Sequence, residues 1–330
     1  MAIPVCDSDT LRAALGLAIR APSVHNTQPW RWRVDEHSAD MYADLSRRLP
    51  HTDPDGRDLI LSGGGALHHL VVALAALGWH ATVNRFPDPA DPHHLAHLEL
   101  SPQAATALDV SLAAAIPRRQ TDRRHYSFWP VPAGDIALMG ARAARAGVVM
   151  RQVASLPELQ RVVARAAFEH ASNHDYLTEL TTWSGHYGSV AGVPAHSTPP
   201  SDPTAAVPGR LFAAPALGQP PGTAAKDDNA VVLALGTNDD SPVARLRAGE
   251  ATSVVLLTAT AHGLATCPVT EPLEIAGTRR AVQADVFGGD AFPQMLLRVG
   301  YAAVNADPLP PTPRFPIDHF VEWQGQTRQH

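Results

Sequence analysis

Apolar residues recur at helical spacing near the start of the chain, and two later segments are apolar almost all round. Segment 11–19 follows the i, i+3, i+4 spacing of an amphipathic helix, and Pro22 ends it. Segments 59–77 and 248–262 lack a continuous polar face. We expect both to be buried helices that pack together at the centre of the protein.

Shorter periodic segments surround these two helices. Helical spacing predicts further helices at 136–146, 156–170 and 174–180. Alternating or short apolar runs predict strands at 31–34, 81–86, 95–100, 148–153, 231–235 and 295–299. Serial strand–helix units are lacking in this order. The pattern therefore favours an α+β fold over a doubly wound parallel sheet.

A long segment between the predicted helices and the strand at 231–235 has a different composition. Residues 183–229 are dense in Pro, Gly, Ser and Ala, which excludes long helices and central strands. A loop of this length is either disordered or a lid over a site. We favour a lid, because the segment also carries large side chains that a plain linker does not need, namely Trp183, Tyr187, Leu211 and Phe212.

Composition narrows the class of protein. The chain has 330 residues, of which 45% are hydrophobic and 18% charged, so it can bury a substantial core as one large domain or two ordinary ones. A net charge of −6 argues against nucleic acid or an anionic membrane as a general partner. Two cysteines are too few for a disulfide framework, and neither a signal peptide nor a membrane span is apparent. We expect a cytoplasmic protein.

The loop after the first helix is the first candidate for chemistry. It lies between two prolines and offers a hydroxyl, carboxamides and backbone N–H groups to one flat polar ligand. The alternative is an ordinary helix-ending turn. The candidate residues of this loop are Pro22, Ser23, His25, Asn26 and Gln28.

A basic run is the second candidate. Arg118, Arg119, Thr121 and Arg123 follow one another closely, and Arg124 comes next. Guanidinium groups bind phosphate oxygens bidentately, and a threonine hydroxyl adds a short hydrogen bond. The alternative is a solvated basic turn.

Both motifs resemble those of the nitroreductase family of FMN-dependent flavoproteins. Ala-Pro-Ser-x-x-Asn-x-Gln-Pro-Trp at 21–30 is similar to the loop that the family places beside the FMN ring. Arg119, Thr121 and Arg123 resemble the family's opening Arg-x-Ser/Thr-x-Arg/Lys motif. The resemblance implies a nitroreductase-like fold that binds FMN, with these basic residues on its phosphate.

Two further segments extend the resemblance over nearly the whole chain. Residues 263–271 are similar to a Gly-Leu-Gly-x-x-x-Pro stretch whose backbone covers the other ring face. Arg314 matches a basic residue of the family's closing motif that also binds the phosphate, whereas Thr312 stands where the family often has Lys. The residues that the resemblance adds beside the ring are Pro268, Val269, Thr270 and Glu271.

The two motifs occur in the opposite order to that in the family. In the family the basic motif precedes the Ser/Asn loop and each FMN lies between two subunits, but here the motif follows the loop by about ninety residues. A tandem fusion accounts for this order, with units at 1–115 and 116–330 that form an intramolecular pseudo-dimer. The chain thus looks like the duplicated, mycobacterial Acg-type branch. We expect a monomer with one FMN.

The resemblance implies an NAD(P)H-dependent oxidoreductase. Hydride would pass through FMN N5 to a nitroaromatic or quinone acceptor by a ping-pong mechanism, without a catalytic side chain of the protein. Arg161 and Arg165 are candidates for balancing negative charge on the reduced ring. The alternatives are a non-catalytic FMN-binding or storage protein whose lid blocks substrates, and a degenerate fold that binds no flavin.

Three other motifs give weaker evidence of function. The glycine run 62–65 matches no nucleotide-binding fingerprint and suggests close packing at the start of a buried helix. His68-His69 and the histidines at 93, 94 and 97 lack a nearby carboxylate or cysteine at ligand spacing, so we expect no metal site. No Gly-x-Ser-x-Gly elbow indicates a serine hydrolase.

Overall fold

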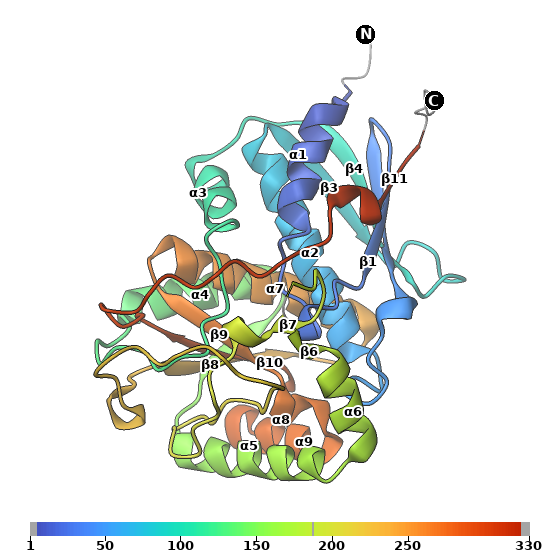
Figure 1. Cartoon of the computed structure of the whole chain (residues 1–330). Coiled ribbons are helices and arrows are strands. Elements are labelled where there is room, and N and C mark those ends of the chain that lie inside the picture. The colour runs from blue at the N-terminus through green and yellow to red at the C-terminus, as the bar shows by residue number, and fades with distance from the viewer. Residues whose placement is uncertain (1–4, 187, 325–330) are drawn as a thin grey trace.

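A mixed five-stranded sheet and an antiparallel four-stranded sheet lie on either side of a central pair of helices in the computed structural model, which describes residues 5–186 and 188–324 (Figure 1). The central helices are α2 (Arg57–Ala76) and α7 (Pro242–Ala261), and they pack directly against each other. This mixed architecture agrees with the predicted α+β class, and the expected contact between the two apolar helices is confirmed.

The first sheet has five strands and is covered by α1 (Ser8–Ala18) and α2. Trp30 and Trp32 are buried because alternate residues of its first strand face these helices. Its strand order is β11 (Val321–Trp323), β1 (Trp30–Val34), β2 (Ser38–Ala43), β4 (His94–Pro102) and β3 (Trp79–Arg85).

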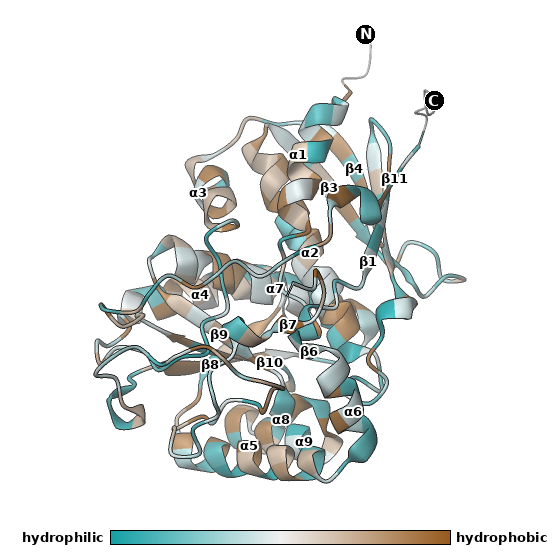
Figure 2. Cartoon of the chain, in the orientation of Figure 1, coloured by the Kyte–Doolittle hydropathy of each residue, from teal (hydrophilic) through white to brown (hydrophobic). Residues whose placement is uncertain are grey.

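The second sheet has four strands, all antiparallel. Its order is β5 (Val149–Gln152), β8 (Val231–Thr237), β10 (Phe292–Gly300) and β9 (Ala265–Val269). In β10, Leu297 packs with residues of α4 (Ala133–Arg145) and α7, whereas Leu296 packs with α5 (Leu156–Ala171) and α9 (Ala276–Phe287). Both faces of the sheet are therefore covered, and Figure 2 shows hydrophobic residues along β8.

The central helix crossing depends on two glycines. A Cβ atom on Gly64 would lie 2.1 Å from the Leu246 carbonyl oxygen, and one on Gly249 would lie 2.1 Å from the Leu61 carbonyl oxygen. The backbones of α2 and α7 can approach this closely only where side chains are absent. The prediction of close packing for the glycine run is confirmed, but the run lies inside α2 and not at its start, which is Arg57.

The apolar character of α2 has a structural explanation. It is long and apolar enough to cross a membrane by length and composition, yet 72% of its most apolar window is buried inside the protein. The first sheet, α1, α3 (Ala107–Ala115) and α7 pack around it, so this is the helix of a protein core.

Several elements were not predicted. Strands β2, β9 and β11 were missed, as were the helices α3 (Ala107–Ala115), α8 (Glu271–Glu274) and α9. Strand β11 pairs in parallel with β1. The end of the chain thus returns to the first sheet, and a division into 1–115 and 116–330 does not account for this tail.

The proline-rich segment, residues 183–229, has only short elements in its described part. They follow α6 (His174–Thr182). As its prolines predict, the segment lacks long helices and central strands within the residues that the structure describes, and one expected anchor, Tyr187, lies outside them. Its elements are β6 (Ser184–His186), β7 (Val193–Pro194), η3 (Ala195–Ser197) and η4 (Ala225–Asp227).

Candidate functional site

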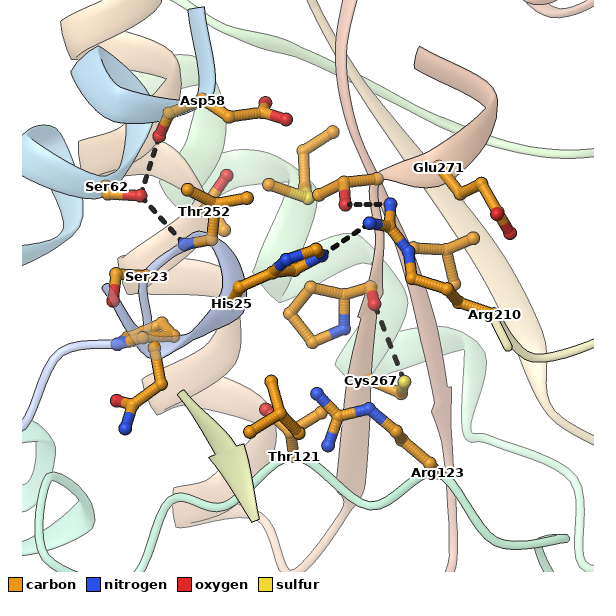
Figure 3. Close-up of a pocket in the computed structure, with 18 of the residues that line it drawn as sticks. Ser23, His25, Asp58, Ser62, Thr121, Arg123, Arg210, Thr252, Cys267 and Glu271 are labelled. Atoms are coloured by element: carbon orange, nitrogen blue, oxygen red, sulfur yellow. Dashed lines mark hydrogen bonds between the residues drawn. The ribbon is translucent and has the colours of Figure 1, made fainter. Parts of the chain in front are cut away.

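A large cavity opens where the second sheet, the central helices and the proline-rich segment meet. Its empty space, including the open mouth, is about 1370 Å³. The walls come from the loop around η1 (Val24–Asn26), α2, α7, β9, the basic run and the C-terminal tail (Figure 3). Segments far apart in the sequence therefore share one site.

Most of the residues singled out from the sequence line this cavity. They come from both predicted units, and the structure brings them together around one space. The residues in its wall are Pro22, Ser23, His25, Asn26, Arg119, Thr121, Arg123, Pro268, Val269, Thr270, Glu271 and Arg314.

Two of the predicted site residues lie elsewhere. Gln28 is fully buried behind the wall, where its amide nitrogen donates to the Val190 carbonyl (2.8 Å) and its oxygen accepts the Phe315 N–H (3.1 Å). Arg118 is exposed and donates to the Ala114 carbonyl (3.1 Å) at the end of α3. Gln28 thus holds chain segments together, and the side chain of Arg118 diverges from that of Arg119.

The loop around η1 has an unusual backbone. His25, Asn26 and Gln28 have φ angles of 44°, 54° and 54°, in the left-handed region that non-glycine residues rarely adopt. Two hydroxyls hold the loop: Ser23 Oγ accepts the Gln28 N–H (2.9 Å) and Ser62 Oγ accepts the Val24 N–H (3.0 Å). Backbone strain of this kind is often found at binding sites.

Asn26 lines the cavity, and the nitrogen and oxygen of its amide have different surroundings. Its nitrogen donates to the carbonyls of Gly192 (3.0 Å) and Pro313 (3.2 Å). Its oxygen is buried and accepts no hydrogen bond from any described residue. The nitrogen thus ties the loop to the proline-rich segment and the tail.

Arg119, which is buried, and Arg314, which is half-buried, lie at one end of the cavity. Arg119 is 7% exposed, and its Nε and Nη1 have no hydrogen-bond partner among the residues that the structure describes. The same is true of Nε of Arg314, whose Nη2 donates to the Ala21 carbonyl (3.3 Å). Buried donors without partners are costly, and this end of the cavity concentrates them.

The pKa values of Arg119 and Arg314 also show that this end of the cavity is short of negative charge. Burial and then the charge of Arg20 and Arg123 lower the pKa of Arg119 to about 10. Burial and then the charges of Arg119 and Arg20 lower the pKa of Arg314 to about 9. Several cations thus repel one another in a desolvated place, and a dianion would relieve the repulsion.

Arg210 is a cavity residue that the sequence analysis missed. It is the only arginine of the proline-rich segment, and its side chain is buried in an ion pair with Glu274. Its Nη1 donates to His25 Nε2 (2.5 Å) and its Nη2 to Thr270 Oγ1 (3.2 Å), as Figure 3 shows. Burial, followed by the Arg210 charge, places the pKa of His25 well below its usual range, so this imidazole is neutral.

Phe212, two residues after Arg210, also lines the cavity. Its ring meets that of His25 edge-on at 6.0 Å, and the Arg123 guanidinium lies 5.0 Å from its centroid. Arg123 also donates to the Ser197 carbonyl (3.1 Å). The proline-rich segment thus occupies part of the space between the loop and β9.

The two arginines proposed to balance ring charge do not reach the site. Arg161 and Arg165 lie on the outer face of α5, with side chains 76% and 63% exposed. Arg165 pairs with Glu169 (2.8 Å) one turn along the helix. Neither lines the cavity, so the expectation is wrong for both.

The histidine clusters have partners of their own. His94 and His97 both lie 2.8 Å from Asp40 Oδ1, a carboxylate that β2 supplies across the sheet from a position remote in the sequence. His68 and His69 both approach the Ser253 hydroxyl, at 2.7 and 2.9 Å. In the described part of the chain no group of His, Cys, Asp and Glu is placed to hold a metal ion.

Comparison with curated proteins identifies the family. The chain is 63% identical over 317 residues to "Putative NAD(P)H nitroreductase Rv3131" of Mycobacterium tuberculosis, covering 96% of this chain and 92% of that protein. It is 37% identical over 324 residues to "Putative NAD(P)H nitroreductase acg" of the same species, covering 94% and 95%. No sequence-family profile matches. The chain belongs to the nitroreductase family, in its mycobacterial Acg-type branch.

Solved nitroreductase structures show weak overall similarity to this chain. The FMN-dependent nitroreductase NfnB from Mycobacterium smegmatis in complex with NADPH is 16% identical with a TM-score of 0.40, covering 64% of this chain and 97% of that one. A nitroreductase with bound FMN from Bacteroides fragilis is 14% identical with a TM-score of 0.39, covering 59% and 90%.

Proposed function

We propose that this protein binds FMN in the described cavity and acts as an NAD(P)H-dependent oxidoreductase. The pair Arg119 and Arg314 carries the proposal, because both line the cavity and have guanidinium nitrogens without partners among the described residues, which a bound anion would satisfy. The names of the mycobacterial relatives, NAD(P)H nitroreductases, support the same activity.

The cavity residues fit FMN in two parts. Arg119, Arg314, Arg123 and the Thr121 hydroxyl would hold the phosphate, since all four line the cavity. Ser23, His25 and Asn26 would border the ring from one side, together with Pro22. On the other side the ring would meet β9 and the start of α8, at Pro268, Val269, Thr270 and Glu271.

FMN would supply reversible hydride transfer at N5 between a reduced nicotinamide and an acceptor such as a nitroaromatic or a quinone. The protein's part is to orient the ring and to exclude water from it. The two substrates would use the same side of the cavity in turn, which predicts a ping-pong mechanism.

We further propose that the chain is a fused pair of family units that functions as a monomer. Cavity residues come from both 1–115 and 116–330, as an intramolecular pseudo-dimer requires. The Ser/Asn loop belongs to the first unit and the basic run to the second. One complete FMN site per chain follows from this division.

Two measurements test the function. Purified protein should quench FMN fluorescence on titration, and the loaded protein should oxidise NADH or NADPH when a nitroaromatic or a quinone is added. Initial rates at several acceptor concentrations should give parallel lines in a double-reciprocal plot. A protein that binds no FMN would overturn the proposal and favour a degenerate fold.

The proline-rich segment favours a second candidate function, a non-catalytic FMN-binding protein whose lid blocks substrates. Arg210 and Phe212 stand in the cavity, and Asn26 and Arg123 donate to carbonyls of the segment. If the segment blocks access, the double variant Arg210→Ala, Phe212→Ala should oxidise NAD(P)H at least tenfold faster than the intact protein.

The neighbouring Leu211 supplies a matched control. It is 54% exposed and lies outside the cavity wall, so Leu211→Ala should leave the rate unchanged. Equal rates in the intact protein and the double variant would exclude the blocking lid.

A further inference from the structure

Arg20 is a cation near the cavity that the proposed function does not use. It follows α1 in the chain and is exposed to solvent. Its Nη2 donates a hydrogen bond to the carbonyl of Pro117 (3.3 Å), which comes two residues before Arg119. This contact brings the end of the first helix against the start of the basic run.

The C-terminal tail reaches the same place from a third segment of the chain. Arg314 Nη2 donates to the carbonyl of Ala21 (3.3 Å), the residue next to Arg20. The two hydrogen bonds therefore hold Arg20 close to both Arg119 and Arg314. Its charge is among those that lower the pKa of each of these two arginines, which agrees with this placement.

The three arginines form a path of positive charge from the cavity wall to the surface. Arg119 is buried and Arg314 is half-buried in the wall, whereas Arg20 is exposed. None of the three forms an ion pair within the part of the chain that the structure describes. Arg12, an exposed arginine earlier on α1, differs in this respect because it pairs with Asp318 (2.9 Å).

The protein as a whole has the wrong sign of charge to attract FMN. Its net charge is −6, and a phosphate monoester carries about two negative charges at pH 7. Cationic side chains that extend to the surface at a cleft can reverse this repulsion locally and raise the association rate. An exposed cation at the phosphate end therefore acts on the approach of the ligand, whereas Arg119 and Arg314 act on its retention.

We propose that Arg20 is the outer part of the phosphate site and attracts phosphorylated flavin to the cavity. The inference rests on the proposed binding of FMN. Because Arg20 stays exposed and hydrated, it contributes attraction over a distance and not a desolvated contact. The chain thus selects FMN over riboflavin by the rate of association as well as by affinity, since riboflavin has no phosphate.

Stopped-flow fluorescence of the protein freed of flavin tests this role. At low ionic strength, Arg20→Gln should slow FMN association about fourfold and Arg20→Glu about tenfold or more, because one and two unit charges are lost. Arg20→Lys should keep the wild-type rate, because it retains the charge. At about 0.5 M salt the four association rates should agree within about twofold, because screening removes the attraction.

Riboflavin and Arg12 provide the controls. Riboflavin should associate at the same rate with the wild type and with every Arg20 variant, because it carries no charge for Arg20 to attract. Arg12 lies about two helical turns before Arg20. Arg12→Gln changes the net charge of the protein by the same amount as Arg20→Gln, and it should leave the association of FMN unchanged.

The outcomes separate this inference from the proposed function. If FMN binds but Arg20→Gln and Arg12→Gln have the same effect on its association, the role of Arg20 alone is wrong. Equal slowing of riboflavin and FMN in Arg20→Gln would assign the residue a structural role and would also overturn the inference. A wild-type protein that binds no FMN would overturn the proposed function, and this inference with it.

Discussion

Arg119 and Arg314 lie at the cavity without an ion-pair partner among residues 5–186 and 188–324. Each guanidinium is desolvated, and the remaining cations nearby repel it. Charge-assisted hydrogen bonds to a bound phosphate are worth about 1.5–3 kcal/mol each. An anion at this place would therefore turn an unfavourable cluster into a strong binding contribution.

We predict that Arg314→Ala weakens FMN binding at least tenfold, because it removes phosphate contacts and leaves the ring contacts intact. Riboflavin, which lacks the phosphate, should bind the variant and the wild type equally. Fluorescence titration with both ligands measures the difference.

Arg118 provides the control for this prediction. Since its side chain is exposed and outside the cavity wall, Arg118→Ala should leave FMN affinity unchanged. An equal loss of riboflavin and FMN binding in Arg314→Ala would remove the phosphate role from this residue.

Single residues were predictable only where a whole motif was present. The order Arg-x-Thr-x-Arg placed Arg119, Thr121 and Arg123, and the structure gathers all three at the cavity. Arg210 carries no local pattern, because it reaches the site through the path of an irregular segment. Gln28 was misassigned since its left-handed backbone turns the side chain away from the cavity.

At the scale of elements, the crossing of α2 and α7 sets the position of the cavity walls. Both helices contribute residues to the wall within one turn of the crossing, such as Ser62 and Thr252. Their axes can come this close because Gly64 and Gly249 present backbone to each other.

We predict that Gly64→Ala or Gly249→Ala lowers the free energy of unfolding by about 1–3 kcal/mol or more, because the added methyl meets a rigid carbonyl oxygen. Thermal and chemical denaturation followed by circular dichroism would measure it.

Gly16 in α1 is the matched control. A Cβ there meets nothing within 4 Å, so Gly16→Ala should stabilise the protein by up to about 1 kcal/mol through helix propensity. If all three substitutions had the same effect, close packing at the crossing would not be the reason for the glycines.

Helices with a long apolar run were predicted correctly. Short strands, and a strand whose partner lies far away in the sequence, were missed. The apolar runs of α2 and α7 were unambiguous. Strand β2 buries only Ala39 and Met41 in alternation, which is a weak signal in six residues. Strand β11 forms by parallel pairing with β1 from the other end of the chain, and local sequence contains no sign of that partner.

At the scale of the whole molecule, the cavity gathers the loop of the first unit and the basic run of the second. This arrangement predicts one FMN per chain and a monomeric mass in solution. Isothermal titration gives the stoichiometry, and light scattering gives the mass. Binding of two FMN per chain would contradict the tandem-fusion hypothesis.

Arg314 belongs to a tail that follows both sheets in the chain and is anchored when β11 joins β1. During synthesis, both sheets apart from β11 can leave the ribosome before this arginine does. The end of the cavity that we propose to hold the FMN phosphate is consequently completed last, because Arg314 leaves the ribosome after the other residues of the wall. A nascent chain halted before residue 314 would hold a nearly complete core with an unfinished cofactor pocket, so folding of the core precedes retention of the ligand.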